Sequence, residues 1–132
     1  YNFKFTFYSK INNQNSERII IIDNVGILSE LYKYSDITYI GSGFNDGIHS
    51  VIEPAVYFNA ISFGPKYQIV DTAIDLVKLK LSYVINSKND FYNFIKLLDQ
   101  DNKLKNIKHN LKKYISNIKP VSEKIVYYIF NK

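Results

Sequence analysis

Three glycines fall within seven residues directly after an apolar run, and this stretch constrains the fold more than any other. Gly41, Gly43 and Gly47 follow Ile37–Ile40 and lead into a segment whose apolar residues have helical spacing. Glycine lets the backbone approach a ligand closely, and the first N–H groups of a helix are unpaired donors at the positive end of its dipole. A glycine-rich turn of this kind, between a strand and a helix, is typical of phosphate-binding sites.

The polar residues at the start of this helix have two interpretations. Ser50 and Glu53 have the spacing of a capping box, in which the serine oxygen and the glutamate carboxylate satisfy free N–H groups. The same two side chains are also placed to contact a ligand in the turn. His49 is equally open, since it can brace the loop or donate to a phosphate or sugar oxygen. Spacing alone does not separate these alternatives.

Short apolar or alternating segments recur along the chain and predict strands. Ile19–Ile22 is apolar and β-branched throughout, which predicts a parallel strand buried on both faces. Asp23 follows it, with a helix-capping role and, as the alternative, a ligand role. The other predicted strands are the alternating Phe3–Tyr8 segment, Ile37–Ile40, Ala60–Phe63 and Leu81–Ile85.

Segments with helical spacing separate these strands. Ser87 or Asn89 is expected to cap a helix that runs to Leu98, and Pro120 is expected to end the long amphipathic helix before it. That helix carries Leu104, Ile107, Leu111, Ile115 and Ile118 on one side and Lys105, Lys108, Lys112 and Lys113 on its outer side. The remaining predicted helices are marked by Leu28, Leu31 and Tyr32, by Val51–Phe58, by Val70, Ala73, Ile74 and Val77, and by Ile125, Val126 and Ile129.

This alternation predicts a parallel, doubly wound α/β sheet. In such sheets ligands bind beyond the carboxyl ends of the strands. Three segments are expected along that edge, namely Asp23–Ile27, Gly41–Glu53 and Gly64–Lys66. A phosphate-bearing or nucleotide ligand is therefore favoured over a purely structural domain.

Composition limits the other possibilities. The chain has 132 residues, enough for one domain; it does not begin with Met, so we expect it to be part of a longer protein. It has no cysteine, which excludes disulfides and thiolate metal sites, and it has no apolar run of membrane-spanning length. It also lacks a Ser/His/Asp nucleophile pattern, paired histidines at ligand spacing and a Gly-Lys-Ser/Thr phosphate motif.

Charge is distributed unevenly. Residues 1–77 hold 5 basic and 8 acidic side chains, a net charge of −3, whereas residues 78–132 hold 12 and 4, a net charge of +8. This basic part is interpreted either as the solvated lysine face of amphipathic helices or as a surface for nucleic acid or anionic lipid. Lys, Asn, Ile and Tyr are all favoured by A/T-rich codons, so codon bias explains part of the lysine content.

Several blocks of the chain, in order and at similar spacing, resemble the nucleotide-binding half of 3-deoxy-D-manno-octulosonic acid (Kdo) transferases. The resemblance runs from about Phe5 to Leu81. The blocks that carry it are Asp23-Asn24-Val25-Gly26-Ile27-Leu28, Leu31-Tyr32, Ser35-Asp36, Ile40-Gly41-Ser42-Gly43-Phe44, Gly47-Ile48-His49-Ser50-Val51-Ile52-Glu53-Pro54-Ala55 and Phe63-Gly64-Pro65.

The resemblance implies a fold and an activity. The fold would be α/β, a Rossmann-like parallel sheet with helices on both faces, forming the C-terminal half of a GT-B glycosyltransferase. Residues 1–132 would be a single nucleotide-sugar-binding domain with basic amphipathic C-terminal helices over residues 103–132. The intact enzyme would move Kdo from CMP-Kdo to a lipid A precursor in lipopolysaccharide synthesis, at the cytoplasmic side of the bacterial inner membrane. It would need no cofactor and no metal.

The resemblance also assigns site residues. The family's CMP-contacting positions correspond here to Val25, Gly26 and Ile27 and to Ser50, Val51, Ile52 and Glu53, with Gly47 and His49 shaping the turn. A Gly26 N–H would donate to phosphate, and the Glu53 carboxylate would accept from ribose hydroxyls. The catalytic carboxylate belongs to the family's other domain, so no catalytic residue is expected in this chain.

Four positions depart from the family pattern. Asn24 replaces threonine, Ile27 replaces glutamate, Ile48 replaces a glycine and Ser50 replaces asparagine. Ile27 and Ser50 each remove a polar partner, so the resemblance implies weak nucleotide binding by this chain alone. Because the catalytic carboxylate belongs to the family's other domain, it also implies no turnover.

Two other functions stay open at this point. One is the donor domain of another GT-B glycosyltransferase, which would use a UDP-sugar. The other is a small basic interaction module whose C-terminal helices bind nucleic acid or an anionic membrane. The leading hypothesis has CMP-Kdo, a lipid A precursor and a membrane surface as partners, and no nucleic acid.

Overall fold

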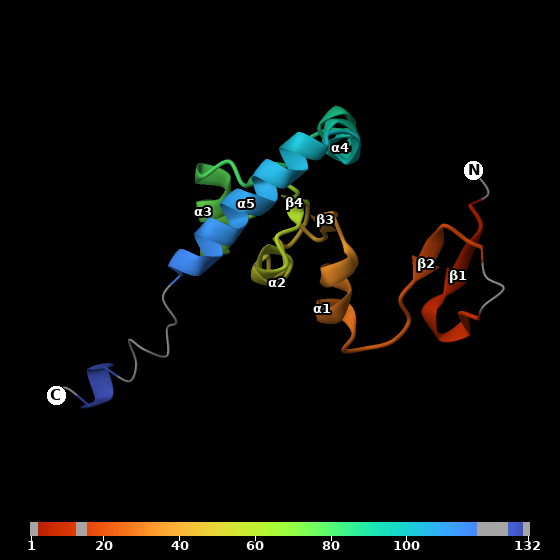
Figure 1. Cartoon of the computed structure of the whole chain (residues 1–132), viewed down its shortest axis with the longest axis horizontal. Helices are drawn as coiled ribbons and strands as arrows, with labels where there is room; N and C mark the ends of the chain where they lie inside the picture. The colour runs from red at the N-terminus through yellow and green to blue at the C-terminus, as the bar shows by residue number, and fades with distance from the viewer. Residues whose placement is uncertain (1–2, 13–15, 119–126, 131–132) are drawn as a thin grey trace. The chain divides into compact units, whose positions relative to one another are not determined.

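The computed structural model describes residues 3–12, 16–118 and 127–130. The chain divides into two compact units, Tyr1–Leu31 and Tyr32–Lys132, each of which is described by itself (Figure 1). The expectation of a single domain over residues 1–132 therefore stays a prediction.

The first unit is built on two parallel strands. Strand β1 (Phe5–Phe7) pairs with β2 (Ile19–Ile21), with Phe5 opposite Ile19. The Asp23 carboxylate, beyond the end of β2, accepts hydrogen bonds from the backbone N–H and the hydroxyl of Ser9. These bonds lower the pKa of Asp23. Asp23 thus links the ends of the two strands instead of capping a helix. The remaining elements of the unit are η1 (Tyr8–Lys10) and α1 (Leu28–Leu31).

The expected burial of Ile19–Ile22 is wrong for the described structure. The four isoleucine side chains are between 37% and 50% exposed. The reason is that this unit has two three-residue strands and two single helical turns among its described residues, too little to cover both faces of a sheet. The parallel pairing is as predicted, but the two-sided covering is not.

The second unit contains a parallel sheet in the order β3-β4-β5, as expected from the alternation of strands and helices. Strand β3 spans Ile37–Ile40, β4 spans Ala60–Phe63 and β5 spans Ser82–Val84. Its helices are η2 (Tyr32–Tyr34), α2 (Ile52–Val56), α3 (Asp71–Lys78), α4 (Lys88–Ile95), η3 (Lys96–Asp99) and α5 (Asp101–Asn117).

The core of this unit surrounds β4. All four residues of β4 are buried, which is expected for a central strand covered on both faces. Helix α5 contacts β4 and α2, and it crosses the unit as the long blue helix in Figure 1. Its buried residues are Leu104, Ile107 and Leu111, and Ile115 is partly buried, which confirms these positions of the predicted apolar face. Ile118 was wrongly included, because the helix ends at Asn117 and Ile118 is 42% exposed.

Two details of the helices differ from or refine the predictions. Ser87, rather than Asn89, caps α4, and its hydroxyl forms a complete capping box with Asp90. Lys108 was expected on the outer side of α5, but its Nζ lies 2.7 Å from Asp36 Oδ1 and so ties α5 to the start of β3. Residues 127–130 are helical, while Ile125 and Val126 lie outside the described residues.

None of the helices in the described part of the chain combines the length and apolar character needed to cross a membrane.

Candidate functional site

The loops that follow β3 and β4 meet at the carboxyl edge of the sheet. The backbone N–H of Lys66, after β4, donates to the Gly43 carbonyl at 2.8 Å. The Lys66 ammonium donates to the Asn45 carbonyl, also at 2.8 Å. The structure therefore brings together two of the three segments that were expected along this edge. The third, Asp23–Ile27, belongs to the first unit.

Two glycines allow this close approach. A Cβ atom on Gly43 would lie 2.6 Å from the backbone nitrogen of Gly64, and one on Gly64 would lie 2.6 Å from the Gly43 carbonyl carbon. Both distances are shorter than real contacts allow, so no larger residue fits at either position without movement of the backbone. The glycine-rich turn is thus needed for loop packing, besides any ligand.

The predicted capping box at the start of α2 is absent. The N-cap residue is Val51, one position later than the motif requires, and it makes no side-chain capping bond. Ser50 and Glu53 are both exposed. Within the described residues, no hydrogen bond or ion pair engages the side chain of either one. Of the two interpretations, the cap is excluded and contact with a ligand stays a prediction. Because α2 has only five residues, its dipole adds little to such a site.

His49 braces the turn. Its Nε2 lies 3.3 Å from the Ser42 hydroxyl, across the glycine-rich segment. Ser42 has a φ of 64°, a left-handed conformation that is uncommon outside glycine. This contact supports the loop-bracing interpretation of His49, and donation to a phosphate or sugar oxygen stays a prediction. Its imidazole is nonetheless exposed.

Tyr32 lies beside Glu53. Burial and the nearby Glu53 carboxylate both raise the pKa of the Tyr32 phenol, burial having the larger effect. Tyr32 belongs to η2, which packs against α2. Sequence reasoning placed Tyr32 on an apolar helix face and did not associate it with Glu53. Tyr32 and Glu53 are 21 positions apart in the sequence, and no local pattern indicates that they lie near each other.

The remaining predicted site residues differ in accessibility. Val51 is fully buried, so only its backbone is available, whereas Ile52 is 37% exposed. Gly47 is buried. Ile48, which replaces a family glycine, is 5% exposed and packs in the core, so this departure concerns the core. In the first unit, Val25 and Gly26 are exposed and Ile27 is partly buried, with Gly26 at a φ of 92°.

A cavity that sequence reasoning missed lies at the carboxyl end of β5. Its volume is about 350 Å³, and β5, α4, η3 and the start of α5 enclose it. Tyr83 and Phe94, whose ring centroids are 5.4 Å apart, line it together with Lys96 and Lys103. No local motif marks this cavity, since its lining comes from four separate elements.

A metal centre is not evident in the part of the chain that the structure describes. No three histidine, aspartate or glutamate side chains lie close enough there to hold an ion together. The expectation that the activity needs no metal was drawn from a resemblance and stays a prediction.

The parallel sheet, its helices and its glycine-rich carboxyl edge are the features of a Rossmann-like nucleotide-binding fold. The fold is Rossmann-like, and it matches the crystal structure of the C-terminal CMP-Kdo binding domain of WaaA from Acinetobacter baumannii with a TM-score of 0.68 at 19% identity. The match covers 76% of this chain and 54% of that one. The chain thus has the fold of the C-terminal half of a GT-B glycosyltransferase.

Sequence comparison confirms the resemblance to Kdo transferases. The chain is 30% identical over 104 residues to the 3-deoxy-D-manno-octulosonic acid transferase of Rickettsia bellii and 27% identical over 101 residues to that of Chlamydia muridarum. It is also 30% identical over 105 residues to a bifunctional glycosyltransferase/methyltransferase of Fusobacterium nucleatum.

These matches involve a small part of each relative. They include about three quarters of this chain but 25%, 24% and 16% of the three proteins, in the order given. No protein-family model matches the chain.

Proposed function

We propose that this chain is the donor-binding part of a glycosyltransferase that moves Kdo from CMP-Kdo to a lipid A precursor in lipopolysaccharide synthesis. The observation that carries the proposal is the agreement between the named relatives and the glycine-rich edge of a Rossmann-like sheet. A second domain would present the acceptor and the catalytic base. The base would take the proton of an acceptor hydroxyl, whose oxygen would attack the anomeric carbon of Kdo while the bond from that carbon to the phosphate oxygen breaks and CMP leaves.

The proposed donor contacts are those implied by the resemblance. Glu53 accepts hydrogen bonds from the ribose hydroxyls, and the Gly26 N–H donates to the phosphate. Glu53 is exposed and takes no part in a helix cap, so its carboxylate is available for this role. The other proposed contacts are Val25, Ile27, Gly47, His49, Ser50, Val51 and Ile52.

The proposed function also covers metal dependence and location in the cell. We also propose that the reaction needs no metal, with the donor held by backbone N–H groups and Glu53. The intact enzyme would work at the cytoplasmic side of the inner membrane, where a lipid acceptor is found. The chain alone would bind nucleotide weakly and would transfer no sugar.

An NMR titration of the whole chain with CMP tests the proposal. We expect the amide signals of Gly26, Gly47 and Glu53 to shift, and Glu53→Gln to weaken binding about tenfold by removing a charged acceptor. Asp71→Asn is the matched control, because Asp71 is also an exposed acid in the first turn of a helix. Shifts confined to other regions, or equal effects of the two variants, would contradict the proposal.

A second candidate is the donor domain of a different GT-B glycosyltransferase. The Fusobacterium nucleatum relative favours it, because that protein is named a glycosyltransferase without mention of Kdo. Such an enzyme would use a UDP-sugar, so UDP would bind this chain more tightly than CMP.

A further inference from the structure

The lysines of the second unit are concentrated in its C-terminal part. Residues 32–77 contain two lysines and five acidic residues, whereas residues 78–118 contain nine lysines and three aspartates, a net charge of +6. Codon bias raises the lysine content evenly along a chain and does not explain this separation. The donor-site residues all precede residue 78, so the proposed function leaves the basic part unexplained.

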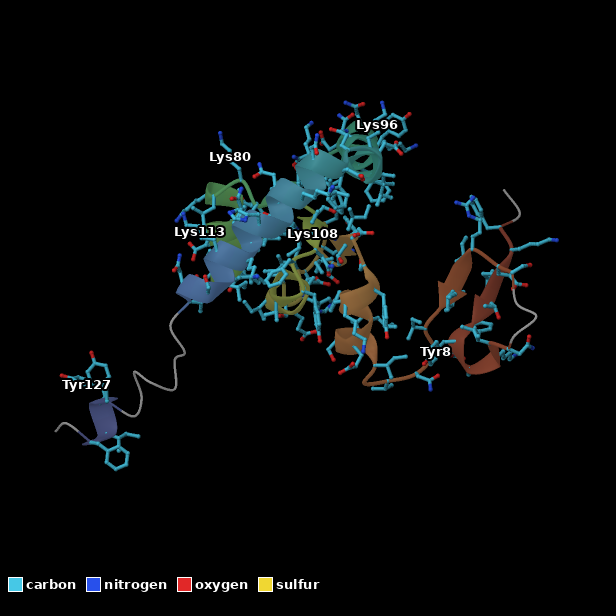
Figure 2. The ribbon with its side chains drawn as sticks, in the orientation of Figure 1. Tyr8, Lys80, Lys96, Lys108, Lys113 and Tyr127 are labelled. Carbon is cyan, nitrogen blue, oxygen red and sulfur yellow. The ribbon has the colours of Figure 1, made fainter. Side chains whose placement is uncertain are left out.

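One end of this basic part has a groove with an apolar floor. The groove has a volume of about 330 Å³ and lies between the α3–β5 loop and the C-terminal half of α5. Leu79, Leu81 and Tyr114 give it apolar walls, and Lys113 lies at its rim. Figure 2 shows Lys80 and Lys113 on the same side of the unit, and Lys96 near the other end of α5. The remaining lining residues are Asn110 and Asn117.

The loop beside the groove combines charge with an exposed aliphatic side chain. Leu79 is 54% exposed and stands between Lys78 and Lys80 in the sequence. Lys80 has a φ of 57°, which turns the chain sharply at this point. Among the described residues, Lys78, Lys80 and Lys113 form no ion pair. Asp75 is the nearby acid, since its charge helps to raise the pKa of Tyr114. Lys78, Lys80 and Lys113 thus outnumber the one acid that acts on the groove residue Tyr114.

We propose that this surface, made of Lys78, Leu79, Lys80 and Lys113 around the groove, docks on a membrane rich in anionic lipids. The lysines attract the headgroups, and Leu79 enters the boundary between headgroups and acyl chains. The proposal does not depend on the donor site, because the two surfaces share no residue.

The chemistry favours lipid over nucleic acid. The single arginine of the chain is Arg18, which belongs to the first unit, so the basic part lacks the forked guanidinium that reads phosphate pairs and guanine. On the proposed surface the exposed apolar side chain is the aliphatic Leu79, and the aromatic Tyr114 packs against the core. The exposed rings of the basic part, Phe91 and Tyr92, belong to α4 instead. Aliphatic insertion suits a bilayer, whereas single-strand binding requires exposed rings for stacking.

Vesicle co-sedimentation with the whole chain tests the proposal. We expect binding to phosphatidylcholine vesicles that contain about 30 mol% phosphatidylglycerol, no binding to phosphatidylcholine alone, and loss of binding at high salt. The triple variant Lys78→Gln, Lys80→Gln, Lys113→Gln should bind about tenfold more weakly or worse. Leu79→Ser should weaken binding several-fold at unchanged charge, because it removes the inserted side chain.

A second triple variant provides the matched control. Lys88→Gln, Lys96→Gln and Lys103→Gln remove the same charge from α4, η3 and the first turn of α5. This variant should keep vesicle binding within about twofold, and the circular dichroism of both variants should match that of the parent chain. Equal losses in the two triple variants would overturn the proposal in favour of non-specific attraction by net charge. Absence of anionic vesicle binding would also overturn it, and retention on duplex DNA in that case would assign the surface to nucleic acid.

Discussion

At the scale of single residues, Gly43 and Gly64 decide how closely the two loops at the sheet edge approach. Gly43→Ala should destabilise the chain by about 1 to 3 kcal/mol, because its Cβ would overlap the Gly64 backbone. Gly41→Ala is the control, since nothing lies within 4 Å of a Cβ at that position. Urea unfolding of both variants measures the difference. Similar stabilities would contradict the described loop contact.

Asn59 is a second residue on which the fold depends. It is fully buried, its amide nitrogen donates to the carbonyls of Tyr32 and Ser35, and its Oδ1 accepts from Thr38. Asn59→Ala should lower the free energy of unfolding by about 1 to 3 kcal/mol, because two buried carbonyls lose a donor.

The exposed Asn93 gives the comparison for this experiment. Asn93→Ala should change the free energy of unfolding by less than about 0.5 kcal/mol. An Asn59 variant as stable as the Asn93 variant would show that the amide does not hold η2 and β3 together.

The sequence alone could not predict which of two possible capping boxes forms. Ser50 and Glu53 have the spacing of a capping box, but the helix begins one residue later and the motif is unused. At Ser87 a box does form, with Asp90. Both segments have a serine followed three residues later by an acidic residue. The box forms only where the helix begins directly after the serine, and the spacing alone does not determine where a helix begins.

At the scale of elements, the cap of α4 makes a measurable contribution. Ser87→Ala should cost about 1 kcal/mol, because the Asp90 N–H loses its acceptor. Asn89→Ala, at the alternative position considered from the sequence, should cost less than half of that. Thermal unfolding measures both. A larger effect at Asn89 would mean that the helix begins elsewhere.

The same cap predicts a pH dependence. Hydrogen bonds from the Ser87 hydroxyl and from the backbone N–H groups of Asn86 and Ser87 lower the pKa of Asp90 from 3.8. A carboxyl whose pKa is lower in the folded state stabilises the fold above its unfolded pKa and loses that effect as the pH falls. Asp90→Asn should therefore lose less stability than the parent chain between pH 7 and pH 3. An equal loss would show that Asp90 is uncoupled from folding.

Element bounds could be predicted where the signal is local. Strands β3 and β4 match the predicted Ile37–Ile40 and Ala60–Phe63, because each is a short, mainly apolar run between turn residues. Helix α2 is shorter than the predicted Val51–Phe58. It ends with the N–H groups of Phe58 and Asn59 bonded to the carbonyls of Ala55 and Pro54. This ending needs a left-handed residue, here Phe58 at a φ of 60°, and a phenylalanine gives no such signal.

At the scale of the whole molecule, the alternation of elements predicted one parallel sheet with intervening helices. The parallel pairing and the helices are confirmed, but the described strands form two separate sheets, β1-β2 and β3-β4-β5. The ordered motif blocks then suggested the family, which the relatives and the matching structure support. The contact between the β3 and β4 loops, the Glu53–Tyr32 proximity and the cavity beyond β5 were not predictable, because each joins residues distant in sequence. The exposure of β2 was not predicted, because an apolar run indicates that a strand favours burial but does not show that its own unit has enough helices to cover it.

The central claim is that the glycine-rich edge recognises a cytidine nucleotide. Isothermal titration of the whole chain with CMP and, separately, with UDP compares the nucleotide portions of the two candidate donors, CMP-Kdo and a UDP-sugar. We expect CMP to bind at least about tenfold more tightly than UDP, with dissociation constants in the range of weak binding. Tighter binding of UDP, or no binding of either nucleotide at millimolar concentration, would contradict it.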